Sequence, residues 1–180
     1  QACSVSDLPQ RDARVVWHPY TQHGVEPEPL PVVGAKDAWL ELADGRRLLD
    51  GISSWWANLH GHSHPALVAA ISEQAQRLDH VLFAGATHEP AVELAEQLLA
   101  IAPKGLSRVF YSDDGSTAVE AALKMVLQAW VHREQPRRRV FVALEGAFHG
   151  DTFGAMAAGD PDPFFQPFEP MMFEVRRVPI

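Results

Sequence analysis

Two short apolar runs, separated by a long helical pattern, constrain the fold of this chain most strongly. The runs SRVFYS (107–112) and RVFVAL (139–144) have the length and the β-branched and aromatic content of buried strands. Strand, helix and strand in this order predict a right-handed parallel crossover unit. Between the runs, DDGS precedes apolar residues at the i, i+3, i+4, i+7 spacing of a helix, namely Val119, Ala122, Leu123, Val126, Leu127 and Trp130.

Weaker patterns before this unit complete the expected fold. His64-Pro65 predicts the start of one helix, and a second helix is expected near 90–102. Asp44-Gly45 is a hairpin signal between two β-type runs, and residues 1–30 show no period and are expected to form an arm. We therefore expect an α/β fold, with the arm and a small antiparallel sheet in residues 1–60 and part of a larger, mostly parallel sheet with helices in residues 61–180.

Composition excludes several classes of protein. An apolar content of 47% in 180 residues can supply a substantial core, and the net charge of -8 argues against nucleic acid or an anionic membrane surface as a partner. No segment approaches the roughly 18 apolar residues of a membrane span. Cys3 is the only cysteine, so a cytoplasmic protein without disulfides is expected. Both ends are expected to be cut, because the chain starts without methionine and stops within an extended run.

Two polar loops are expected to meet at one edge of the parallel sheet. Ligands bind beyond the carboxyl ends of such strands, where Gly115-Ser116 and the run Phe148-His149-Gly150-Asp151 both fall. Free N–H groups and the helix dipole favour a phosphate at Gly115-Ser116, although Asp114 or Ser116 can also serve only as a helix N-cap. The second loop offers an aromatic face to a planar cofactor and polar groups to orient it, or has a purely structural role.

The stretch SSWWANLHGHSHP (53–65) combines adjacent tryptophans with alternating histidines. Neighbouring residues point in different directions in a helix or a strand, so the two indoles cannot share one core. Alternate histidines can bind a metal from one face of a strand, but a glycine and a proline interrupt this one. Since no cysteine pair and no HExxH motif accompany them, we expect no metal site at His60, His62 and His64.

Several separated stretches of the chain carry a resemblance to one family. The stretches are WHPYTQ (17–22), DGRRLLDGISSWWANLHGHSHP (44–65), HVLFAGATHEPAVELAEQL (80–98), DDGSTAVEAALKM (113–125) and FHGDTFGAM (148–156). They resemble the adenosylmethionine-8-amino-7-oxononanoate aminotransferases, which are class III, fold-type I pyridoxal-phosphate transaminases of biotin synthesis. The GS turn (115–116) and the HGD loop (148–151) are common to class III, whereas HPYT together with SSWW is specific to this family.

The resemblance implies a cofactor, two substrates and a dimer. Family members transfer the amino group of S-adenosylmethionine through pyridoxal 5'-phosphate to 8-amino-7-oxononanoate, as homodimers with the active site at the interface. The resemblance implies that Gly115 and Ser116 hold the cofactor phosphate. It also implies that Phe148 packs over the pyridine ring of the cofactor, with His149 in the same loop. Trp56 is expected to pack against the protein. The residues implied in substrate binding are Tyr20, Trp55, Phe148 and Asp151.

Three departures from the family pattern bear on activity. Phe148 replaces a common tyrosine and lacks the hydroxyl that can bond to substrate. Asp114 stands where serine or asparagine is common and adds a negative charge near the phosphate. The family's Schiff-base lysine has no counterpart among the lysines of this chain, so we expect it beyond Ile180 and expect no transaminase activity from these 180 residues alone.

Other interpretations stay open at this point. A truncated, non-catalytic paralogue acting as a binding or interaction module is one alternative, and a histidine-based metal protein is another. The amino donor is also open, because some relatives accept lysine. A half-sheet without its remaining strands leaves apolar edges uncovered, so we expect the piece alone to associate or to be poorly soluble.

Overall fold

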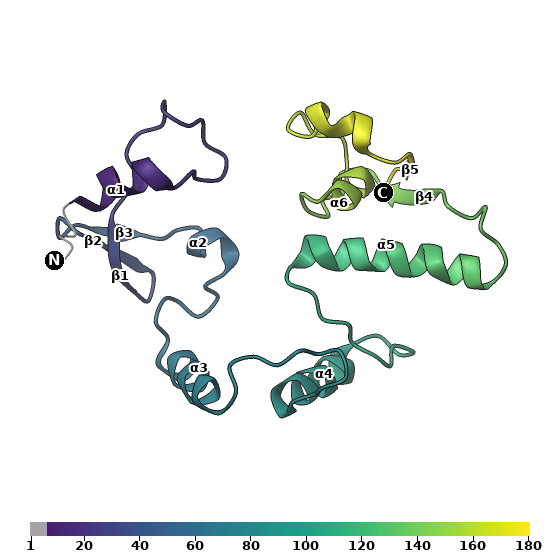
Figure 1. Ribbon diagram of the computed structural model, residues 1–180, viewed down its shortest axis with the longest axis horizontal. Helices are drawn as coiled ribbons and strands as arrows, with labels where there is room; N and C mark the ends of the chain where they lie inside the picture. The colour runs from purple at the N-terminus through teal and green to yellow at the C-terminus, as the bar shows by residue number, and fades with distance from the viewer. Residues whose placement is uncertain (1–6) are drawn as a thin grey trace. The chain divides into compact units, whose positions relative to one another are not determined.

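The small antiparallel sheet forms around the hairpin that Asp44-Gly45 predicts. In the computed structural model, which describes residues 7–180, strands β1 (Val32–Lys36), β2 (Trp39–Leu42) and β3 (Arg47–Leu49) pair in that order (Figure 1). Gly45 has a φ of 85°, which a glycine adopts without cost. The sequence predicts β2 and β3 but not β1, since the glycine, alanine and lysine of VVGAK are poor strand formers.

Over its described residues, 7–87, the N-terminal unit also contains three helices. α1 (Leu8–Val15) lies in the stretch expected to be an arm without a period, and its eight residues are too few for a periodic pattern to stand out. α3 (Pro65–Arg77) confirms the predicted start at His64-Pro65, with His64 as the N-cap residue. α2 (Ser53–Trp56) is a single turn. Cys3 and the rest of the first six residues lie outside the described part.

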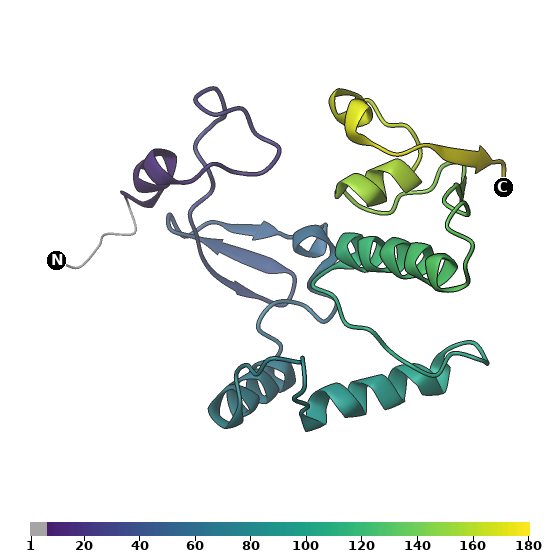
Figure 2. The same cartoon turned by 45° about the vertical axis from the view of Figure 1, so that its right-hand side comes forward.

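The C-terminal unit runs from His88 to Ile180 and contains the parallel pairing. β4 (Phe141–Leu144) pairs in parallel with β5 (Val175–Val178), and α5 (Gly115–His132) packs beside α6 (Phe153–Ala158) (Figure 2). Residues Ala155 to Ala158 of α6 are buried and form the core of this unit. The unit is completed by α4 (Glu89–Ile101) and the 3-10 helix η2 (Gln166–Met171).

The sequence predicts a buried strand at residues 107–112, and this prediction is wrong. The segment has no ladder partner in the described chain, and Phe110 is 67% exposed. A strand needs a neighbour to which its backbone can hydrogen-bond, and β4 pairs instead with β5. The parallel crossover therefore passes from β4 through α6 and η2 to β5, and the α/β class is unchanged.

The chain divides into two compact units, and the helices of its described part are not suited to cross a membrane. The contacts within the chain divide it into two compact units after Thr87. The predicted boundary at residue 60 separates an arm and small sheet from the larger sheet of the fold, and it stays a prediction. Within residues 7–180, none of the helices has both the length and the apolar character needed to cross a bilayer.

Candidate functional site

The first turn of α5 leaves two backbone N–H groups available to a ligand. Asp114 caps the helix: its Oδ1 accepts a hydrogen bond from Thr117 N–H at 2.8 Å, and Asp114 N–H donates to Thr117 Oγ1 at 3.1 Å. The N–H groups of Gly115 and Ser116 have no acceptor within the helix. A Cβ built on Gly115 meets no atom within 4 Å, so the space beside this backbone is open. The positive end of the helix dipole therefore lies where a phosphate can approach closely.

A chain of hydrogen bonds joins α5 to the loop before α6. Ser116 Oγ accepts from Thr152 N–H at 2.9 Å and lies 2.8 Å from Thr152 Oγ1. Glu120 accepts from Gly154 N–H at 2.5 Å, and the Thr152 hydroxyl, bonded to the same carboxylate, is the main cause that lowers the pKa of Glu120. Because Thr152 donates its proton to Glu120, the Ser116 hydroxyl donates its own proton to Thr152 Oγ1.

In this arrangement Ser116 positions a loop, and the donors left for an anion are backbone N–H groups. A hydroxyl has one proton, so Ser116 can donate to a phosphate only after rotating away from Thr152. The implied phosphate contact of the Ser116 hydroxyl stays a prediction. The backbone N–H groups of Gly115 and Ser116 can bind a phosphate without any rotation of the Ser116 side chain.

The HGD loop lies against the start of α5, so the two predicted loops do meet. Gly150 makes this contact possible: its φ is 115°, and a Cβ there would lie only 2.5 Å from Ser116 Oγ. The Phe148 ring is 71% exposed, His149 is half-buried and Asp151 is exposed. An aromatic face, an imidazole and a carboxylate therefore lie on the loop that contacts the first turn of α5 within one unit.

Charged side chains from two other elements hold the ends of α6. Glu120 binds the N-terminal end, and the Arg177 guanidinium donates to the carbonyl oxygens of Gly159 at 2.6 Å and Ala157 at 3.1 Å. A negative group at the start and a positive group at the end both complement the helix dipole. Sequence analysis missed Glu120 and Arg177, because neither belongs to a local motif that marks this role.

In the N-terminal unit, Tyr20 and Trp55 stack face to face. Their ring centroids are 5.5 Å apart with planes at 17°, and Trp56 meets Trp55 edge-on at 6.4 Å and 75°. The expectation that Trp56 packs against the protein is wrong in this chain, because its side chain is 74% exposed and contacts Trp55 instead. Exposed aromatic faces of this kind can stack on a planar heterocycle.

The backbone that carries Trp55 is left-handed over four consecutive residues. Trp56 N–H donates to Ile52 O at 2.9 Å and closes the turn. Left-handed backbone costs about 1–2 kcal/mol for each such residue, so the turn carries roughly 4–8 kcal/mol of strain that the surrounding structure must offset. The sequence does not predict this turn, because residues 53–56 include neither glycine nor asparagine. The φ values are 50° for Ser53, 46° for Ser54, 64° for Trp55 and 67° for Trp56.

The alternating histidines make separate contacts. His62 Nε2 lies 2.7 Å from Asp50 Oδ2, and the rings of His60 and His64 are 6.0 Å apart. Residues 7–180 contain no group of at least three histidine, cysteine, aspartate or glutamate side chains that could hold a metal ion.

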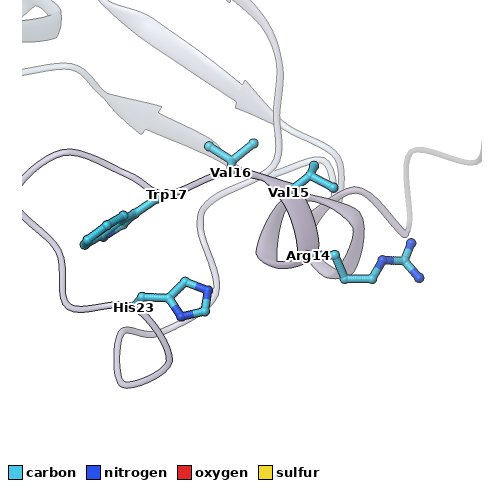
Figure 3. A pocket seen from close by; sticks show the side chains of 5 residues that line it. All are labelled: Arg14, Val15, Val16, Trp17 and His23. Atoms are coloured by element: carbon cyan, nitrogen blue, oxygen red, sulfur yellow. The ribbon is translucent and has the colours of Figure 1, made fainter.

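A hollow of about 520 Å³ lies in the arm of the N-terminal unit (Figure 3). Trp17 and His23 approach edge to face there, with ring centroids 6.4 Å apart. None of the residues implied in cofactor or substrate binding lines this hollow. The lining residues are Arg14, Val15, Val16, Trp17 and His23.

Comparison with known families agrees with this geometry. The model of the class-III aminotransferases matches residues 20–180, and the chain belongs to this family. The fold is that of the fold-type I pyridoxal-phosphate transferases.

Individual relatives share a more specific name. The adenosylmethionine-8-amino-7-oxononanoate aminotransferase of Synechococcus elongatus is 56% identical over 164 residues, which cover 91% of this chain and 38% of the relative. The enzyme of the same name from Geobacter sulfurreducens is 42% identical over 170 residues, covering 93% and 38%. The chain thus spans less than two fifths of the length of these curated relatives.

Solved structures of transaminases superpose on nearly the whole chain. The adenosylmethionine-8-amino-7-oxononanoate aminotransferase of Methanocaldococcus jannaschii matches with a TM-score of 0.90 and 36% identity, covering 98% of this chain and 41% of that one. An omega transaminase of Pseudomonas jessenii, solved in complex with PMP, matches with a TM-score of 0.86 and 26% identity over 96% of this chain and 39% of its own.

Proposed function

We propose that the protein to which this chain belongs is a pyridoxal-phosphate transaminase of biotin synthesis. It transfers the amino group of S-adenosylmethionine to 8-amino-7-oxononanoate and gives 7,8-diaminononanoate. The observation that carries this proposal is the 56% identity to the Synechococcus elongatus enzyme of that name. The protein acts as a cytoplasmic homodimer with the active site at the subunit interface, and its Schiff-base lysine comes from sequence outside residues 1–180.

The first turn of α5 and the HGD loop hold the cofactor in this proposal. The N–H groups of Gly115 and Ser116 bind the phosphate, and the exposed Phe148 ring covers the pyridine with His149 beside it. The bound cofactor supplies an electron sink for the α-carbon of the amino donor. The open space beside Gly115 and the two N–H groups without an intrahelical acceptor fit a phosphate.

The aromatic pair of the N-terminal unit recognises the substrates in this proposal. The adenine of the donor offers a π-face to Tyr20, and the apolar chain of the acceptor packs along Trp55. Asp151 and Phe148 complete the substrate contacts from the HGD loop. Phe148 has no hydroxyl, so it contributes ring contact and no hydrogen bond to the substrate.

The visible absorbance of the cofactor tests this function in the full-length protein. We expect the wild-type protein to bind pyridoxal phosphate and the absorbance to bleach when S-adenosylmethionine is added. Ser116→Ala removes the bond that fixes the HGD loop and should weaken cofactor retention about tenfold. Bleaching with lysine but not with S-adenosylmethionine would keep the transaminase and reject the donor, and a protein that binds no cofactor would favour a non-catalytic module.

A further inference from the structure

Both carboxylate oxygens of Asp50 bind one residue of the left-handed turn. Oδ1 accepts from Ser54 N–H at 2.9 Å, and Oδ2 accepts from the Ser54 hydroxyl at 2.7 Å. The Asp50 carbonyl oxygen also accepts from Ser53 N–H at 3.2 Å. Two side-chain bonds and one backbone bond therefore fix the start of the turn on Asp50. The Asp50 side chain is only 6% exposed, whereas Ser54 is exposed.

His62 ties this carboxylate to the antiparallel sheet. Its Nε2 lies 2.7 Å from Asp50 Oδ2, and its side chain is 14% exposed. The His62 backbone is itself bridged to Asp37, between β1 and β2, by N–H···O bonds of 2.7 and 3.1 Å in the two directions. Asp50 thus lies between an anchored imidazole and a strained turn.

We infer that Asp50 is a positioning residue, oriented by His62, that holds the left-handed turn of α2 so that the Trp55 ring lies against Tyr20. Ser54 follows Asp50 by four residues, and the next residue carries the stacked indole. The turn contains no glycine to adopt the left-handed conformation without cost, so side-chain bonds must hold it. The link from ring position to substrate binding rests on the proposed function, whereas the link from Asp50 to ring position does not.

A second aspartate of the same unit provides a matched control. Asp44 also uses both carboxylate oxygens on one nearby residue, accepting from Arg46 N–H at 3.0 Å and Arg46 Nε at 2.6 Å. Its turn contains Gly45, which takes the positive φ. An Asp44→Asn substitution therefore replaces one of two similar acceptor oxygens, as Asp50→Asn does, without releasing a strained aromatic turn.

The test compares Asp50→Asn with Asp44→Asn in the full-length protein by two readouts. The first is the circular dichroism of the coupled Tyr20, Trp55 and Trp56 rings, assigned by its loss in Trp55→Leu. The second is steady-state kinetics with S-adenosylmethionine. We expect Asp50→Asn to lose the ring signal and to raise KM about tenfold with kcat unchanged. Asp44→Asn should leave both readouts at the wild-type values.

A rescue variant separates positioning from direct action on a substrate. Ser53→Gly lets one of the four residues of the turn adopt its φ of 50° without strain, so adding it to Asp50→Asn should partly restore the ring signal and KM. An unchanged ring signal in Asp50→Asn, or no rescue by the glycine, overturns the inference. If Asp50→Asn does not fold, His62→Ala removes a single bond and provides the same test. A wild-type protein without transaminase activity rejects the proposed function, while the ring signal still decides this inference.

Discussion

At Asp50, hydrogen bonds lower the pKa of the carboxyl group from 3.8 to about 2. The Ser54 N–H is the largest cause, followed by the Ser54 hydroxyl and by His62, the titratable group that faces it. Because the folded-state pKa lies below the unfolded one, the carboxylate stabilises the fold fully above about pH 4. That contribution is lost as the pH falls from about 4 to about 2.

Acid titration of stability therefore tests Asp50 as a single residue. Asp50→Asn should be less stable than the wild type near neutral pH, and the difference in free energy of unfolding should shrink as the pH falls from about 4 to about 2. Denaturant unfolding at stepped pH measures this difference. A difference that stays constant over the range would contradict the assignment. Asp44→Asn should show a weaker dependence, because its pair with Arg46 is more exposed to solvent.

At the scale of elements, the packing of α6 and its preceding loop on α5 depends on a few polar contacts. Thr152 bonds to Ser116, while Glu120 and Arg177 hold the two ends of α6. The helix is only six residues long, so intrinsic helix formation contributes little, and these contacts together with the burial of Ala155 to Ala158 must hold it. A change in this packing moves the HGD loop relative to the first turn of α5.

Gly150→Ala tests how closely these elements must approach. The added Cβ would be strained at a φ of 115° and would lie 2.5 Å from Ser116 Oγ. We expect a loss of about 1–3 kcal/mol in the free energy of unfolding, together with faster cofactor release. Gly146→Ala is the control, since its φ of 72° is also positive but its Cβ would meet nothing within 4 Å. Equal effects of the two substitutions would show that backbone strain alone matters.

At the scale of the whole molecule, the described chain buries little apolar surface. Its buried apolar side chains are Pro9 and Leu42 in the N-terminal unit and Ala155 to Ala158 in the C-terminal unit. Large side chains such as Phe164 at 81% and Ile101 at 83% are exposed. Apolar exposure on this scale is typical of surfaces that other protein segments cover.

Expression of residues 1–180 alone tests this consequence. We expect the piece to associate and to bind a hydrophobic dye strongly, whereas the full-length protein should give a defined oligomer with weak dye binding. Size-exclusion chromatography with light scattering measures the difference. A monomeric piece without dye binding would mean that the exposed side chains are covered within the chain itself.

Local sequence patterns determined the elements whose signals are local. Pro65 predicted the start of α3, the apolar period predicted α5, and Asp44-Gly45 predicted the hairpin. The HPYT and SSWW motifs identified the family, since they depend only on residue identity. β1 and α1 were missed because a weak strand composition and a helix of eight residues give no strong periodic signal.

Tertiary structure alone decided the features that depend on distant partners. Residues 107–112 have strand composition but no strand, because pairing requires a neighbour that composition cannot supply. Ser116 orients the HGD loop through Thr152, and the left-handed turn of the SSWW motif is bound by Asp50 and, through it, by His62. The sequence names the residues of the motif, but the hydrogen bonds of Asp50, which His62 ties to the antiparallel sheet, offset the backbone strain and determine where Trp55 lies.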